Sequence, residues 1–175
     1  QINRVAVIES GNLISLAEPD WSFVAARFVL QELLKVTSKG KLTYTSLRDY
    51  AERAVAESRM DPNLLLPESE TGFDWEALNT AIRTERDFKF DYLGIQTLAD
   101  RYLLRNASNE VIEMPQHFLM RVSMGLAMAE KPEARTQWAI SFYDHMSSFD
   151  YLPSTPTLFN SGTRFPQLSS CFGAN

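Results

Sequence analysis

One cysteine close to the C-terminal end is the side chain of this sequence best suited to chemistry. Cys171 is the only cysteine among the 175 residues, so an internal disulfide is excluded and any redox partner must lie elsewhere. It directly follows Ser169 and Ser170, whose hydroxyls could bind a polar ligand. A lone cysteine beside an aromatic residue is equally typical of a small core residue, so both interpretations stay open.

Small hydroxyl residues alternate with prolines shortly before this cysteine, in the segment Pro153-Ser-Thr-Pro-Thr-Leu-Phe-Asn-Ser-Gly-Thr163. Because proline restricts the backbone, the pattern predicts a rigid, extended segment with exposed hydrogen-bond donors, which would suit a phosphate or a sugar. The same composition is also typical of an ordinary surface loop. The residues alone do not choose between these two interpretations.

Other kinds of site find little support. His117 and His145 are far apart in the sequence and there is no Cys-x-x-Cys pair, so both histidines are interpreted as structural rather than metal-binding. Ser38-Lys-Gly-Lys41 lacks the glycine spacing of a phosphate-binding loop. The following acidic residues are dispersed and are expected to be solvated: Asp87, Asp91, Asp100, Glu110 and Glu113.

The composition is that of a globular protein. Apolar residues make up 45% and aromatic residues 11% of the chain, and no apolar run reaches the roughly 18 residues of a membrane helix. The net charge of −5 argues against binding to a nucleic-acid polymer, which requires clustered Lys and Arg. The N-terminus has neither an initiator Met nor a signal peptide, so we expect a cut within a longer chain, and a single free thiol fits a reducing cytoplasm.

The elements that must position these residues are mainly helical. Apolar residues recur at helical spacing in the ranges 19–37, 45–58, 74–82, 92–102, 115–129 and 133–149. Asp74 is the expected N-cap of one helix and Pro115 the expected first residue of another. Two short segments, 103–105 and 111–113, flank a polar turn and predict a small β hairpin. From Tyr151 onward the chain becomes turn-rich and is not expected to form a domain of its own.

The residues of the tail and of one helix resemble a known family. Ser154-Thr-Pro-Thr-Leu-Phe-Asn-Ser-Gly162, followed by Gln167-Leu-Ser-Ser-Cys-Phe172, resembles the start of the catalytic barrel in the large subunits of class I and class II ribonucleotide reductases. Glu113-Met-Pro-Gln-His-Phe-Leu-Met-Arg-Val-Ser-Met-Gly-Leu126 is similar to a helix of the same subunits. The segment from Trp21 to Leu34 resembles the last helix of the ATP cone, their N-terminal regulatory module. The resemblance covers essentially the whole chain.

This resemblance implies a fold class and three regions. The chain would be mainly α, with the helical N-terminal domain of the large subunit, a small β hairpin, and the first segment of the ten-stranded α/β barrel. Residues 1–37 would be the C-terminal remnant of the ATP cone. Residues 38–150 would form the helical domain, and residues 151–175 would begin the barrel.

The resemblance also implies an activity and roles for individual residues. The whole enzyme would reduce ribonucleoside diphosphates to 2'-deoxyribonucleotides by a radical- and thiol-dependent mechanism. Cys171 would be one of two redox cysteines, with the second outside this chain, so the fragment would be inactive alone. Ser170 and Thr155 would contact substrate, and Thr157 is the alternative to Thr155. Lys35 falls where the family has a lysine that contacts ATP.

The expected partners follow from the same resemblance. They are the remaining large-subunit polypeptide, a small radical-generating subunit, thioredoxin or glutaredoxin as reductant, and a ribonucleoside diphosphate, without a membrane or a nucleic-acid polymer. The fragment is expected to bind no cofactor, while the full enzyme would use ATP and dNTP effectors. The radical would come from a diiron partner subunit in class I, which the cone remnant favours, or from cobalamin in class II. The alternatives are a non-catalytic helical interaction module and a natural N-terminal half of a split reductase.

Overall fold

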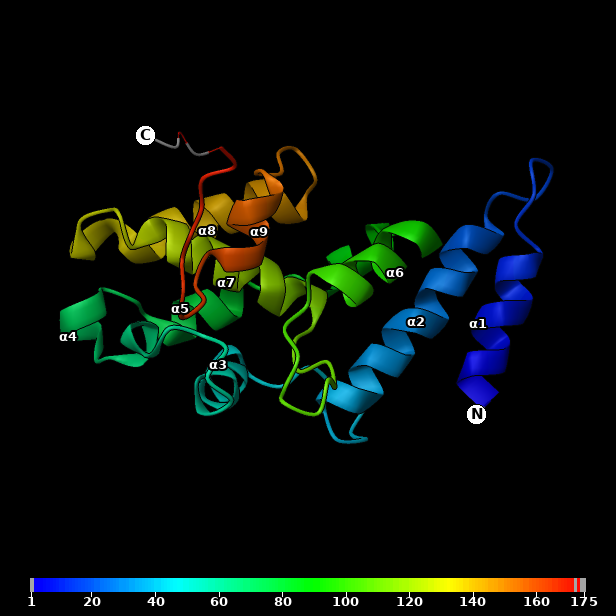
Figure 1. The fold of residues 1–175 in the computed structure, drawn as a ribbon, viewed down its shortest axis with the longest axis horizontal. Coiled ribbons are helices and arrows are strands. Elements are labelled where there is room, and N and C mark those ends of the chain that lie inside the picture. Colours follow the sequence, from blue (N-terminus) through cyan, green and yellow to red (C-terminus); the bar gives the residue numbers. More distant parts are fainter. Residues whose placement is uncertain (1, 172, 174–175) are drawn as a thin grey trace.

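The computed structural model describes residues 2–171 and 173, which form a set of packed helices (Figure 1). The α-helices are α1 (Ile2–Asn12), α2 (Trp21–Thr37), α3 (Leu47–Ala56), α4 (Glu68–Thr71), α5 (Trp75–Ala81), α6 (Tyr92–Arg101), α7 (Pro115–Ala127), α8 (Pro132–Ser147) and α9 (Thr155–Asn160). Two 3-10 helices, η1 (Pro62–Leu65) and η2 (Thr84–Lys89), join them. The described residues contain no β-strand and two isolated antiparallel bridges, Met60–Thr163 and Arg105–Val111.

Helices α1 and α2 pack side by side at one end of the molecule, and α2 also packs against α6 (Figure 1). Helix α2 begins at Trp21, two residues later than the predicted start, because Pro19 and Asp20 form the turn that leads into it. Helix α1 was not predicted. Its sequence has no clear apolar stripe of the kind that marks a core-facing helix. In the structure its apolar residues, such as Val5 and Ile8, are accordingly about half exposed.

Helix α7 is the central element of the fold. It packs against α8 and also contacts α9 and η2, so most of its residues are buried on every side. Pro115 occupies its first turn, as predicted, where a missing N–H costs nothing because the first amides of a helix have no partner within it. The helix also buries Gln116, His117 and Arg121, and buried polar groups need hydrogen-bond partners.

Most of the predicted helices are present with shifted ends. The N-cap prediction for Asp74 is confirmed, since its Oδ1 accepts hydrogen bonds of 3.0 Å from the amides of Glu76 and Ala77. The two segments expected to form a hairpin do run antiparallel, and Ile112 N donates to Leu104 O at 2.9 Å. Their pairing is limited to one bridge, so neither segment is long enough to be a strand.

The prediction of an extended backbone from Pro153 to Thr163 is wrong, because residues Thr155–Asn160 form helix α9. Proline in the first turn of a helix loses no hydrogen bond, so Pro156 is compatible with a helical start. The Leu158 amide donates to the Ser154 carbonyl at 3.1 Å and closes the first turn. The chain then turns at Gly162, which has a positive φ of 72°, and continues without regular structure to Cys171.

Candidate functional site: the Cys171 segment and its buried supports

Cys171 lies on the surface with a free thiol, so the interpretation as a core residue does not apply. Its neighbour Ser170 is also exposed. Phe172, the aromatic residue that follows, lies outside the described residues. An exposed thiol is open to thiol–disulfide exchange, which requires direct access to the sulfur.

Two side chains of α9 hold the segment that leads to this cysteine. Thr157 Oγ1 donates a 3.2 Å hydrogen bond to the carbonyl of Leu168, and Asn160 Nδ2 donates one of 2.7 Å to the carbonyl of Gln167. Residues three positions apart lie on one face of a helix, so α9 presents both donors to the same stretch of backbone. The path of the chain is therefore fixed three residues before Cys171.

The two candidate substrate threonines have different surroundings. Thr155, the first residue of α9, is exposed, and its Oγ1 lies 3.5 Å from the hydroxyl of Tyr102. Thr157 is 9% exposed, and its hydroxyl is engaged with the Leu168 carbonyl. Of the two hydroxyls, that of Thr155 is therefore the more accessible to a ligand.

Lys35 is not part of the same site. It is exposed in the last turn of α2, and α2 and α9 lie in different parts of the molecule in Figure 1. Its expected contact with ATP stays a prediction.

A buried ion pair lies beneath the tail. Arg121 Nε is 2.8 Å from Glu113 Oε1, and Nη2 is 3.3 Å from Oε2; both side chains are completely buried. Tyr50 Oη and Leu104 N also donate to this carboxylate. The expectation that Glu113 is solvated is therefore wrong. Burial alone would lower the pKa of Arg121, but the adjacent carboxylate outweighs it and holds that pKa above its ordinary value.

The same arginine reaches the tail. Arg121 Nη1 donates a hydrogen bond of 2.5 Å to the carbonyl of Ser161, and Ser161 Oγ donates one of 2.7 Å to the carbonyl of Val122. Two glycines, Gly125 and Gly162, allow the backbone of α7 and the backbone of the tail to lie in close contact. A Cβ on Gly162 would lie 2.5 Å from Arg121 O, and one on Gly125 would lie 2.2 Å from Gly162 N. The Ser161–Gly162 turn is thus attached directly to α7.

A second buried network surrounds Asp87, which was also expected to be solvated. Its carboxylate accepts hydrogen bonds from Tyr44 Oη and, at 2.7 Å, from Gln116 Nε2. Tyr143 Oη donates to Gln116 Oε1 at 2.7 Å, so the network links η2 to α7 and α8. Burial raises the pKa of Asp87 to about 6.

His117 lies among these networks as a packed, uncharged ring. It stacks on Tyr50 with centroids 4.7 Å apart, and its Nε2 is 3.2 Å from the carbonyl of Thr45. Burial lowers its pKa to about 3. His145, in contrast, is exposed in the last turn of α8. Among the described residues, no group of three or more His, Cys, Asp or Glu side chains is placed to hold a metal ion.

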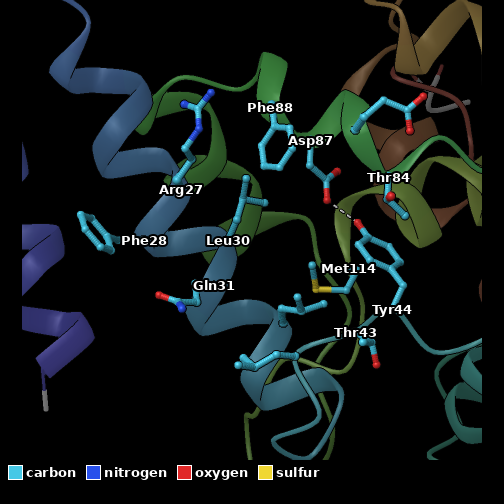
Figure 2. A pocket seen from close by; sticks show the side chains of 13 residues that line it. Arg27, Phe28, Leu30, Gln31, Thr43, Tyr44, Thr84, Asp87, Phe88 and Met114 are labelled. Atoms are coloured by element: carbon cyan, nitrogen blue, oxygen red, sulfur yellow. Dashed lines mark hydrogen bonds between the residues drawn. The ribbon is translucent and has the colours of Figure 1, made fainter.

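A cavity of about 640 Å³ opens between α2, the 42–44 loop and η2 (Figure 2). The Tyr44–Asp87 hydrogen bond lies on its wall, and the guanidinium of Arg27 lies 5.2 Å from the centre of the Phe88 ring. Both oxygens of Asp87 are already hydrogen-bonded to side chains of the protein. None of the residues expected to contact substrate or ATP lines this cavity.

The sequence of the chain is similar to that of a known protein family. Residues 88–166, which include α6 to α9, match the family described as "Ribonucleotide reductase, all-alpha domain". These residues belong to that domain family, and the chain as a whole is similar to ribonucleotide reductase large subunits.

Three relatives show how far the similarity extends. The chain is 41% identical over 172 residues to the ribonucleoside-diphosphate reductase subunit alpha of Helicobacter pylori, covering 98% of this chain and 21% of that protein. It is 45% identical over 159 residues to the subunit alpha of Chlamydia muridarum, covering 89% and 15%. It is 33% identical over 181 residues to the ribonucleoside-diphosphate reductase large chain 2 of Saccharomyces cerevisiae, covering 96% and 19%. The chain thus spans about a fifth or less of the length of these relatives. No described helix is long and apolar enough to cross a membrane.

Proposed function

We propose that this chain is one part of the catalytic subunit of a ribonucleoside-diphosphate reductase, and that it is inactive alone. The observation that carries the proposal is the 41% identity over 98% of the chain to a protein of that name. In the proposed reaction two cysteine thiols become a disulfide and give up two electrons and two protons. The ribose carbon 2' is reduced, and its hydroxyl leaves as water.

Within this reaction Cys171 supplies one of the two thiols, and the second comes from outside this chain. The exposure of the Cys171 thiol supports this role, since a thioredoxin-like protein must reach the disulfide to reduce it. Ser170 and Thr155 contact the substrate, with Thr157 as the alternative to Thr155. The exposure of Ser170 and Thr155 supports the assignment of these two residues as the substrate contacts.

The remaining roles belong to the same proposal. Residues 1–37 are the end of an ATP cone, in which Lys35 contacts ATP. Residues 151–175 are the first segment of the ten-stranded α/β barrel, and the segments 103–105 and 111–113 form a small β hairpin. The partners are the rest of the large subunit, a radical-generating subunit and a thioredoxin-like reductant in the cytoplasm.

The proposal is tested by Cys171→Ser in the full-length large subunit, with Ser169→Ala as a control two residues away. We expect the cysteine variant to lose thioredoxin-supported turnover and still bind the ribonucleoside diphosphate, while the control retains both. Deoxyribonucleotide formation and substrate affinity are measured separately. Multiple turnovers at the normal rate in Cys171→Ser would refute the proposal.

A further inference from the structure

The carbonyl of Gln167 is held by a side chain that has no role in the reaction proposed above. Asn160 Nδ2 donates to it at 2.7 Å. The backbone carbonyl of Asn160 in turn accepts from Thr163 N at 3.1 Å and from Thr163 Oγ1 at 2.7 Å. One residue at the end of α9 therefore closes the turn after the helix and holds the chain that returns beside it.

The other end of this connection is fixed to the core. Ser161, the residue after Asn160, accepts the hydrogen bond from the buried guanidinium of Arg121, and the Gly162 carbonyl accepts one of 3.1 Å from Asp61 N. Because Arg121 is itself paired with Glu113, the position of Asn160 is set by the best-buried part of the domain. Through its hydrogen bond to Gln167, Asn160 connects this fixed part of the domain to the segment that contains Cys171.

Within the described part of the chain, few other contacts hold this segment in place. Residues Arg164 to Gln167 are exposed, and Phe165 is 79% exposed, so burial contributes little to the conformation of the loop. Among the described residues, a second side-chain hydrogen bond to the returning chain is the longer one from Thr157 to Leu168, at 3.2 Å. A loop with few buried contacts opens readily, so a single short hydrogen bond has a large effect on where it lies.

We propose that Asn160 is a positioning residue, which sets the place of the Cys171 thiol for the redox step through its hydrogen bond to Gln167. This inference rests on the proposed function. Asn160 touches neither the substrate nor the reacting sulfur. Loss of the hydrogen bond lowers the rate constant for reduction of the ribonucleotide, because the segment is then no longer held and the Cys171 thiol is displaced.

The test uses Asn160→Asp in the full-length large subunit, which removes the amide donor at nearly constant size and faces the Gln167 carbonyl with an acceptor. Asn106→Asp is the matched control, because Asn106 also donates through Nδ2, to Glu110 Oε2 at 3.0 Å, on an exposed turn away from α9. Asn160→Ala is a second variant that adds no charge. Pre-reduced subunits are assayed in a single turnover without external reductant, and then under thioredoxin-supported turnover.

We expect both Asn160 variants to form as much product per subunit as the wild type, at a rate on the order of ten- to a hundred-fold lower, since misplacement of a reacting group by 1 Å can reduce a rate by about a hundred-fold. The KM for the ribonucleoside diphosphate should stay within about two-fold, and Asn106→Asp should behave as wild type. A lower product yield at an unchanged rate constant would indicate partial misfolding and overturn the proposal. A raised KM at an unchanged kcat would overturn it as well, because it would indicate a substrate contact.

The result also separates this inference from the function on which it depends. If Cys171→Ser is inactive while Asn160→Asp reacts at the wild-type rate, only the positioning role fails. If Cys171→Ser keeps full turnover, the assigned chemistry fails first.

Discussion

Arg121 and Ser161 are joined by a hydrogen bond of 2.5 Å from a fully buried guanidinium to a backbone carbonyl. The arginine belongs to the central helix, and the serine belongs to the segment that leads to Cys171. A charged side chain is thus used to connect the core of the helical domain to its surface tail. Of the buried polar residues of α7 discussed above, Arg121 makes this attachment, whereas Gln116 and His117 contact other parts of the domain.

Replacing Arg121 by Met should destabilise the chain strongly. Loss of the guanidinium leaves the Glu113 carboxylate buried without its counter-charge, which costs on the order of 3–5 kcal/mol. Urea unfolding measures the change in the free energy of unfolding. The control is Arg48→Met, which breaks the exposed Arg48–Glu52 pair and should cost less than about 1 kcal/mol. Equal effects of the two substitutions would contradict the prediction.

A methyl group at Gly125 should separate α7 from the tail. The added Cβ would lie 2.2 Å from the Gly162 amide nitrogen, and overlap with backbone cannot be relieved by rotating a side chain. We expect Gly125→Ala to cost about 1–3 kcal/mol or more and to make the tail more sensitive to limited proteolysis. Gly173→Ala is the control, since among the described residues nothing lies within 4 Å of its added Cβ. Unchanged proteolysis of Gly125→Ala would show that the turn can move aside.

The pKa of Asp87 gives the stability a measurable pH dependence. This pKa rises from 3.8 to about 6 on burial, so the folded state holds a proton that the unfolded state has already released. The stabilisation is fully present below pH 4 and is lost as the pH rises through 6. Between pH 4 and 7 the stability of wild type relative to Asp87→Asn should fall by on the order of 3 kcal/mol, measured by urea unfolding. A difference that does not vary with pH would mean that Asp87 is charged in the folded chain.

His117 should act in the opposite direction. Burial lowers its pKa from 6.5 to about 3, so its contribution is present above pH 6.5 and is lost as the pH falls towards 3. His117→Gln should remove this part of the acid destabilisation, in unfolding experiments at a series of pH values. His145→Gln, at the exposed histidine of α8, is the control for replacing a histidine by glutamine. Acid sensitivity that survives in His117→Gln would place its origin in other groups.

The sequence predicted those parts of the fold that depend on local patterns. Asp74 could be recognised as an N-cap and Pro115 as a helix start, because both preferences come from the few residues around them. Helix α9 was not predicted, because proline and hydroxyl residues occur both in the first turn of a helix and in extended loops. The hydrogen bond from Arg121 to Ser161, directly after α9, depends on the tertiary structure and cannot be inferred from the local sequence.

The buried charges could not be predicted for the same reason. Whether a carboxylate is solvated depends on its partners, and Glu113 has one from α3 and one from the middle of α7. Asp87 depends likewise on Tyr44, far away in the sequence. Cys171 and Ser170 are exposed, which is compatible with the roles proposed for them, and those roles stay predictions. The role proposed for Asn160 could not be predicted from the sequence, because its hydrogen-bond partner is a backbone carbonyl, which every residue has.

The complete burial of the Glu113–Arg121 pair has a consequence for how the tail responds to ionic strength. Mobile ions weaken exposed pairs such as Arg48–Glu52, but they cannot enter a site that excludes water. The attachment of the tail should therefore keep its strength from dilute buffer to molar salt. High salt should then leave the Cys171 segment in place, because its attachment to the core does not depend on exposed charges.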